Sequence, residues 1–373
     1  MLNLSQGVLL DSIVSAIPTP LTKFHRENGA NLGTWFGCAL PDDFGDWRKE
    51  YGFARESVAL LDKNYRSYLD FTGPDRLRYL NAILTNNIKG QANHHGTVSL
   101  FLNPQGHIQA EIETYTFPDR IFGVSFAMIR GRLIKGLDRF IIMDDVTLTD
   151  VTDRFGTLAL EGPKANAVAT KLSGVEVESL AERELRECTV GSFPCSMSKR
   201  TIGGGLSVEF LAERSHLQSL WSLLLAAARE NGGAASGYKA LNVLRLEQGV
   251  PWFGYDFGEK QIPHEAGLQN SHISYTKGCY TGQEIVERVR SRGQVNRSRV
   301  SLKFDSKEQP PAGTPLLFDG KEFGYVTRVG FSPATNAYIG MGYVRREKST
   351  PESVLELSGG GTATVYATPS ESK

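Results

Sequence analysis

The sequence feature that most restricts the fold is a unit of strand, Gly-Pro and helix that occurs twice. In each copy an apolar stretch typical of a strand leads into a Gly-Pro pair, at Gly73-Pro74 and again at Gly162-Pro163. Apolar residues at helical spacing follow, from Leu77 to Leu84 and from Ala165 to Leu172, and Pro is favoured in the first turn of a helix. The pattern predicts two related α+β halves rather than a repeat array.

The stretch between the two units has the pattern of a strand meander. Val98 to Leu102 is typical of a strand, and Asn103 to Gly106 is a turn rich in Asn, Pro and Gly. From Ile108 to Glu113 an apolar face alternates with a polar face that carries Gln109, Glu111 and Glu113. Strands grouped together, without strict alternation with helices, indicate an α+β fold class.

The composition changes after Arg299. Short alternating stretches follow one another closely from Val300 to Tyr366, and Asp319-Gly320 is a hairpin turn signal. This part of the chain is expected to form a separate all-β unit, either a small barrel or a jelly roll.

Composition excludes several classes of protein. The 373 residues include 41 basic and 41 acidic side chains, which argues against a globally basic nucleic-acid binder. The four cysteines show no Cys-x-x-Cys spacing, so a closed metal site and a disulfide framework are not expected, and a reducing compartment fits best. No apolar run approaches the roughly 20 residues that span a bilayer. We expect a cytoplasmic protein without membrane association and without a metal site.

The chemistry of the chain is concentrated in the octapeptide from Lys277 to Glu284, which reads Lys-Gly-Cys-Tyr-Thr-Gly-Gln-Glu. Its thiol, Cys279, lies just before a stretch that is typical of a helix. A helix N-terminus and the neighbouring Lys277 ammonium both favour a thiolate, so we expect a lowered pKa for Cys279. The alternative is an ordinary half-buried thiol in a glycine-containing turn.

The octapeptide resembles the K-G-C-[FY]-x-G-Q-E signature of the YgfZ family. These proteins are folate-binding relatives of the T-protein (aminomethyltransferase) of the glycine cleavage system. The resemblance extends from about Tyr51 to about Ala367, and the residues before Tyr51 find no clear counterpart. It implies an α+β, T-protein-like folate-binding region followed by a small C-terminal β-barrel. The implied domains are an N-terminal extension (1–50), the folate-binding region (51–295, in halves of about 51–150 with 235–295 and 151–234) and the barrel (296–373).

The same resemblance implies tetrahydrofolate as the cofactor and a cavity that holds it. Glu209 matches a strand glutamate that holds the pterin ring in T-proteins, and a carboxylate accepts two N–H bonds from an aminopyrimidine edge. An exposed acid at a strand end is the alternative for Glu209. Arg245, in a Leu-Arg-x-Glu segment, is expected either to face the cavity and pair a folate carboxylate or to form an ion pair with Glu247 or Glu265. The other implied cofactor-binding candidates are Asn86, Tyr238, Lys277, Gln283 and Glu284.

The resemblance also marks two departures from T-proteins. T-proteins carry a pair of aspartates on the strand after the Gly-containing turn, whereas here Glu111 is the acid that remains. A general acid or base must lie within hydrogen-bond reach of the reacting group, so Glu111 and Cys279 are the two catalytic candidates. Leu241 stands where T-proteins usually have an arginine.

A basic run without acids follows the octapeptide, with arginines at 288, 290, 292, 297 and 299. It is expected either to attract an anionic partner, such as a polyglutamate tail, RNA phosphates or an acidic protein face, or to be a solvated linker.

Three functional hypotheses follow from these patterns. The first is a folate-binding protein that assists iron–sulfur cluster assembly or repair. There Cys279 would hold a cluster intermediate or react with a folate-borne one-carbon unit, and iron–sulfur proteins or cluster carriers would be the partners. The second is a folate-dependent aminomethyltransferase or demethylase that uses Glu111. The third is an RNA-associated scaffold, linked to tRNA modification, that works through Arg288 to Arg299.

Overall fold

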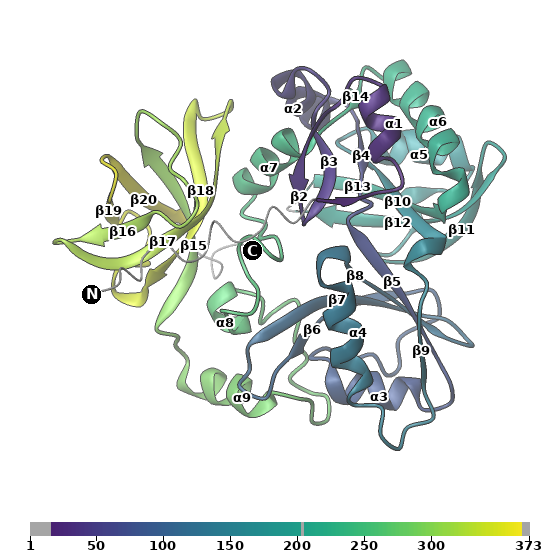
Figure 1. The fold of residues 1–373 in the computed structure, drawn as a ribbon, viewed down its shortest axis with the longest axis horizontal. Coiled ribbons are helices and arrows are strands. Elements are labelled where there is room, and N and C mark those ends of the chain that lie inside the picture. Colours follow the sequence, from purple (N-terminus) through teal and green to yellow (C-terminus); the bar gives the residue numbers. More distant parts are fainter. Residues whose placement is uncertain (1–15, 203–204, 368–373) are drawn as a thin grey trace.

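The structure is a computed structural model that describes residues 16–202 and 205–367. Two mixed layers of sheet and helix form a body, and a closed barrel stands beside it (Figure 1). The α+β fold followed by a C-terminal barrel, expected from the sequence, is confirmed. No helix in the described part of the chain is long and apolar enough to cross a membrane.

The first described segment builds a small sheet in the order β1-β3-β2. Its elements are β1 (Ile17–Pro18), α1 (Thr22–Glu27), β2 (Asn31–Trp35) and β3 (Cys38–Asp43), and α2 (Trp47–Glu56) follows. Leu21, Phe36 and Leu40 are almost fully buried. Leu21 joins the core of the six-stranded sheet described next. Residues that we expected to form an extension therefore contribute to the hydrophobic core from residue 21 onward.

A six-stranded sheet has the order β11-β12-β13-β10-β4-β14. Its strands are β4 (Ala59–Asp62), β10 (Phe155–Glu161), β11 (Leu185–Val190), β12 (Phe193–Ile202), β13 (Gly205–Glu213) and β14 (Ala234–Ala235). The helices α5 (Ala165–Ser173) and α6 (Leu217–Glu230) cover one face (Figure 1). The apolar stripe of α6 supplies Leu220, Trp221 and Leu224 to the core of this sheet.

A five-stranded antiparallel sheet has the order β6-β7-β8-β5-β9. Its strands are β5 (Arg66–Thr72), β6 (Gly96–Leu102), β7 (Ile108–Thr116), β8 (Ile121–Phe126) and β9 (Thr147–Asp150), with the helices α3 (Arg76–Ile83) and α4 (Arg130–Asp138). The apolar face of β7 lies in the core, where Ile108, Ala110 and Ile112 are fully buried. The meander is therefore confirmed, and the polar face of β7 points to the opposite side of the sheet.

The chain crosses from one sheet to the other immediately after β4. β4 pairs with β10, whereas β5 pairs with β8 and β9. Residues 63–65 form the connection between them. This short crossing places Lys63 and Arg66 where the two sheets meet.

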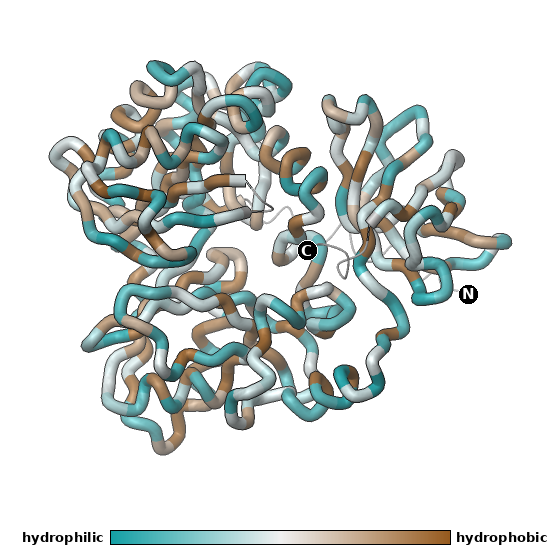
Figure 2. Tube along the Cα trace, turned by 180° about the vertical axis from the view of Figure 1, so that it is seen from behind, coloured by the Kyte–Doolittle hydropathy of each residue, from teal (hydrophilic) through white to brown (hydrophobic). Residues whose placement is uncertain are grey.

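Three helices connect the body to the barrel: α7 (Tyr238–Glu247), α8 (Pro263–Ala266) and α9 (Gln283–Arg292). The closed barrel has the order β15-β18-β17-β16-β19-β20. Its strands are β15 (Arg297–Asp305), β16 (Pro315–Phe318), β17 (Lys321–Ser332), β18 (Ala337–Arg345), β19 (Val354–Leu357) and β20 (Thr362–Ala367). Hydrophilic and hydrophobic residues are interspersed along these strands (Figure 2), and exposed and buried positions alternate along β19.

Candidate functional site

A cavity of about 1280 Å³ lies where the two body sheets, α7 and the first barrel strand converge. Ligand pockets commonly have volumes of about 300–1,000 Å³, so this cavity has room for a cofactor-sized molecule and a smaller second molecule. Aromatic side chains form part of its wall: Phe36, Tyr65, Phe126, Trp252 and Phe253. Its charged lining comes mainly from the crossing after β4 and from β5, β7, β10, β12 and β13.

The centre of the charged lining is Glu209 on β13, which is 4 % exposed. Arg66 forms a bidentate pair with it, in which Nη1 donates to Oε2 at 2.7 Å and Nη2 donates to Oε1 at 2.6 Å. Lys63 Nζ and Arg200 Nη1 each lie 3.7 Å from one of its oxygens. Burial alone would raise the pKa of Glu209, but Arg66, Arg200 and Lys63 together hold it well below the ordinary value. The carboxylate is therefore charged at neutral pH.

Two further carboxylates extend this group of charged side chains, which we call the ionic floor: Lys63, Arg66, Glu113, Glu161, Arg183, Arg200 and Glu209. Glu113 accepts hydrogen bonds from Arg200 Nη1 at 2.6 Å and from Arg183 Nε at 2.9 Å, and these two guanidinium groups lower its pKa against the effect of burial. Glu161 accepts from Lys63 Nζ. Acids and bases thus alternate across the base of the cavity, which is the arrangement that makes buried charges tolerable.

The ionic floor retains capacity for a ligand. A carboxylate has about four acceptor positions, and the hydrogen bonds from Arg66 use one on each oxygen of Glu209. The N–H donors of an aminopyrimidine edge match the remaining positions, and the aromatic wall matches a flat ring. The residues present therefore fit a reduced folate.

Glu111 lies in this cavity, two residues before Glu113 on the polar face of β7. Its Oε2 lies 3.7 Å from Nε2 of His272, and Nδ1 of His272 lies 2.7 Å from Oγ of Ser271. The carboxylate of Glu111 therefore lines the cavity with an imidazole as its neighbour.

Arg245 also lines the cavity, but its donors are already engaged. Its Nη1 donates to Asp256, and its Nε and Nη2 donate to Asn242 Oδ1 at 3.1 and 3.0 Å. Its guanidinium stacks 4.7 Å from the Trp252 ring centroid. The structural ion pair that we weighed for Arg245 exists, but its partner is Asp256 rather than Glu247 or Glu265.

The octapeptide does not line the cavity. Cys279 is exposed, and Lys277 Nζ donates to the backbone carbonyls of Leu84 and Asn86, the latter at 2.9 Å. Glu284, in the first turn of α9, pairs with Arg288 at 2.6 Å. Gln283 is the first residue of that helix. These side chains therefore lie outside the wall rather than beside Glu209.

Asn86 connects the octapeptide to the cavity wall. Its side-chain amide donates to the carbonyls of Val98 at 3.0 Å and Ser271 at 3.3 Å, and both of those residues line the cavity. Tyr238 is buried, donates its hydroxyl to the carbonyl of Asp62 at 2.7 Å and is not part of the lining. Asn86 and Tyr238 thus support the wall instead of facing a ligand.

The basic run is largely paired. Arg290 lies 4.2 Å from the Tyr275 ring centroid and 3.5 Å from a Glu287 oxygen, and Arg297 forks onto Glu265 at 3.0 and 3.2 Å. Arg299 is buried. Arg292 alone of these five arginines is exposed without a described ion pair or burial. This arrangement resembles an anchored linker more than an open surface for an anionic partner.

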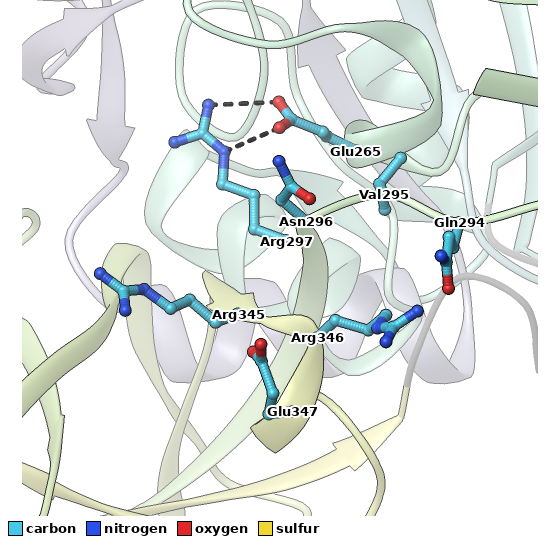
Figure 3. A pocket seen from close by; sticks show the side chains of 8 residues that line it. All are labelled: Glu265, Gln294, Val295, Asn296, Arg297, Arg345, Arg346 and Glu347. Atoms are coloured by element: carbon cyan, nitrogen blue, oxygen red, sulfur yellow. Dashed lines mark hydrogen bonds and ion pairs between the residues drawn. The ribbon is translucent and has the colours of Figure 1, made fainter. Parts of the chain in front are cut away.

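A second, polar hollow of about 460 Å³ opens where this linker meets the barrel (Figure 3). Arg297, Arg345 and Arg346 border it, and the ion pair between Arg297 and Glu265 crosses one side. It shares none of its lining residues with the larger cavity.

Sequence reasoning missed most of the ionic floor. Its unpredicted members are Lys63, Arg66, Glu113, Glu161, Arg183 and Arg200. Glu113 was visible as the next polar position after Glu111 in the alternation of β7. The basic residues carried no signal, because their partners come from strands that are distant in sequence.

The fold and the cavity together define a small-molecule-binding α+β protein with an appended barrel. Residues 21–273 match the family described as the GCVT N-terminal domain, and residues 297–371 match the glycine cleavage T-protein C-terminal barrel domain. The chain therefore belongs to the glycine cleavage T-protein family. The match begins at residue 21, so our expectation that residues before Tyr51 have no counterpart was wrong.

Related sequences align with this chain over most of its length. An aminomethyltransferase of Halothermothrix orenii is 26% identical over 342 residues, which cover 91% of this chain and 94% of that protein. One from Clostridium botulinum is 26% identical over 338 residues, covering 89% and 90%. The crystal structure of glycine cleavage system aminomethyltransferase T from Bartonella henselae superposes with a TM-score of 0.85 at 22% identity, covering 95% of this chain and 98% of that one. The family binds tetrahydrofolate, so the expected cofactor is confirmed at the level of the family.

Proposed function

We propose that this protein binds tetrahydrofolate in the cavity above the ionic floor and assists iron–sulfur cluster assembly or repair through Cys279, as a YgfZ-like member of its family. The cavity that combines carboxylates with an aromatic wall carries the folate part of the proposal. The Lys277 to Glu284 octapeptide, with an exposed thiol, carries the cluster part.

The position of Cys279 favours one of the two roles considered for it. Because the thiol is exposed and outside the cavity lining, it is accessible to a protein partner rather than to a one-carbon unit on bound folate. Within residues 16–202 and 205–367 no group of three or more His, Cys, Asp or Glu side chains is arranged to hold a metal. A cluster intermediate on Cys279 would therefore take its other ligands from an iron–sulfur protein or cluster carrier.

The cluster role is tested in a strain that lacks the gene. We expect Cys279→Ala to fail to restore the activities of cluster-dependent enzymes, whereas Cys188→Ala, which removes a half-buried thiol elsewhere, restores them. Equal rescue by both variants would remove Cys279 from the mechanism. Immunoblots of the two variants confirm equal protein levels.

The folate role is tested by titrating tetrahydrofolate against the purified protein. We expect saturable binding to the wild type and weaker binding to Glu209→Gln, because a neutral amide offers one acceptor oxygen where the carboxylate offers two. Absence of saturable binding to the wild type contradicts the folate part without bearing on Cys279.

A second candidate function is folate-dependent aminomethyl transfer or demethylation, which the position of Glu111 beside His272 favours. The purified protein, given a secondary-amine donor and tetrahydrofolate, should then form methylene-tetrahydrofolate. Glu111→Gln should abolish the reaction, whereas Gln109→Glu, on the same strand but outside the cavity lining, should retain it. No product above background with the wild type excludes this candidate.

A further inference from the structure

The barrel contributes one side chain to the described lining of the cavity, Arg299 of β15. It is 5 % exposed. We propose that Arg299 anchors a carboxylate group of the molecule bound in the cavity. The inference deepens the proposed function, because it rests on the cavity being the ligand site and assigns the part of the ligand that the barrel recognises.

The contacts of Arg299 leave its charge without an anionic partner. Its Nε donates to the carbonyl of Ala266 at 2.9 Å, and its Nη1 donates to the carbonyl of Gly249 at 3.2 Å and lies 3.4 Å from the sulfur of Met341. Among the described residues no carboxylate oxygen lies within the 4.0 Å of an ion pair, and none of the described hydrogen bonds uses Nη2. A buried cation is costly unless an anion compensates it.

The surrounding charges make this imbalance larger. Asp256 is the nearby acid, but it already accepts from Arg245, from the Trp252 backbone N–H at 2.9 Å and from the Thr327 hydroxyl at 2.6 Å. Burial lowers the pKa of Arg299 and of Arg245, yet a guanidinium remains protonated in proteins. Two buried guanidinium groups, those of Arg245 and Arg299, therefore share one nearby carboxylate, so the surroundings of Arg299 carry more positive than negative charge.

A purely structural role does not account for the charge. The two carbonyls that Arg299 braces would be satisfied equally by an uncharged amide, which avoids the cost of burying a cation. A ligand carboxylate is the group whose geometry matches a guanidinium and whose charge completes the site. Two sources share this chemistry: the glutamyl carboxylates of tetrahydrofolate, and the carboxylate of an amino acid bound beside it.

The test compares Arg299→Gln with Arg297→Gln. Arg297 lies two residues earlier on the same strand, carries the same charge and borders the hollow of Figure 3 instead of the cavity. Each protein is titrated with tetrahydrofolate and with tetrahydrofolate whose glutamyl carboxylates are converted to amides. A second pair of ligands is N-methylglycine and its amide, with binding measured by calorimetry.

We expect Arg299→Gln to bind at least one carboxylate ligand about tenfold or more weakly, equivalent to about 1.4 kcal/mol, and to bind the matching amide as the wild type does. The ligand pair that shows this selective loss identifies the source of the carboxylate. Arg297→Gln should leave all affinities unchanged. Arg299→Lys, which keeps the charge, should recover part of the lost affinity and serves as the test variant if Arg299→Gln does not fold.

Equal affinities of Arg299→Gln and the wild type for both carboxylate ligands overturn the proposal, and so does an equal loss for acids and amides. The latter result assigns Arg299 to bracing the wall. Failure of the wild type to bind either folate ligand counts instead against the proposed function, and the N-methylglycine pair then decides the role of Arg299 by itself.

Discussion

Replacement of Arg66 by Met tests the ionic floor most directly. The substitution removes both hydrogen bonds to Glu209 and leaves a carboxylate that is 4 % exposed. Removing one partner of a buried ion pair costs about 3–5 kcal/mol. Lys63 and Arg200 remain 3.7 Å from the carboxylate, so we expect a loss near the lower limit, about 3 kcal/mol at pH 7.

The pH dependence of the stability difference between the wild type and Arg66→Met provides a second, independent test. In the wild type the pKa of Glu209 lies below its ordinary 4.5, so the native state binds fewer protons than the unfolded state in that region. Stability from this group is complete above about pH 4.5 and is lost as pH falls through the native pKa. In Arg66→Met the carboxylate has lost its main partner and protonates more readily. The stability difference between the two proteins should therefore narrow as the pH falls below 4.5.

Equilibrium urea unfolding, followed by tryptophan fluorescence, measures both effects. Arg288→Met is the control, because Arg288 pairs with Glu284 on an exposed helix face and such pairs contribute about 0.3–0.5 kcal/mol. A loss below about 1 kcal/mol for Arg66→Met at pH 7, comparable to a surface pair, would refute the reasoning. A stability difference that does not change with pH would refute the assignment to Glu209.

Three further predictions concern other parts of the molecule. Burial lowers the pKa of Lys277 from 10.5 to about 8, so between these pH values the unfolded state binds more protons than the native state. The unfolding free energy of the wild type, measured in urea, should therefore rise with pH over this range relative to that of Lys277→Met. Asp256→Leu should cost about 3–5 kcal/mol because it leaves Arg245 buried and unpaired, and adding Arg245→Met should recover part of this loss in a double-mutant cycle. The thiols of Cys188 and Cys195 lie 3.5 Å apart in register across β11 and β12, so mild oxidation should join them in a disulfide. Mass spectrometry should detect this disulfide as the loss of two hydrogens from a single tryptic peptide. A cross-link to the exposed Cys279 instead would contradict the pairing.

Local periodicity predicted the elements well because it records which face is buried. The alternation from Ile108 to Glu113 placed Glu111 correctly on the face opposite the core. The apolar residues at helical spacing from Ala165 to Leu172 predicted α5 for the same reason. Neither pattern depends on a distant part of the chain.

The ionic floor depends on pairing that no local pattern contains. β4 and β5 are adjacent in sequence, and no local pattern indicates that they belong to different sheets. Arg66 therefore looked like an isolated arginine in an apolar strand, although its partner Glu209 lies far along the chain in β13. For the octapeptide the motif itself is specific, but it does not predict whether the thiol of Cys279 lines the cavity or lies outside it.

The two charged surfaces of the cavity have different consequences for a ligand. The floor around Glu209 is balanced by its own bases, so its hydrogen bonds orient a ligand while the charges compensate one another. The wall around Arg299 is not balanced, so it selects for negative charge. Because the floor comes from the body and Arg299 comes from the barrel, a ligand that contacts both would hold the two parts together. Saturating tetrahydrofolate should then raise the unfolding temperatures of body and barrel together, by the linkage of binding to stability.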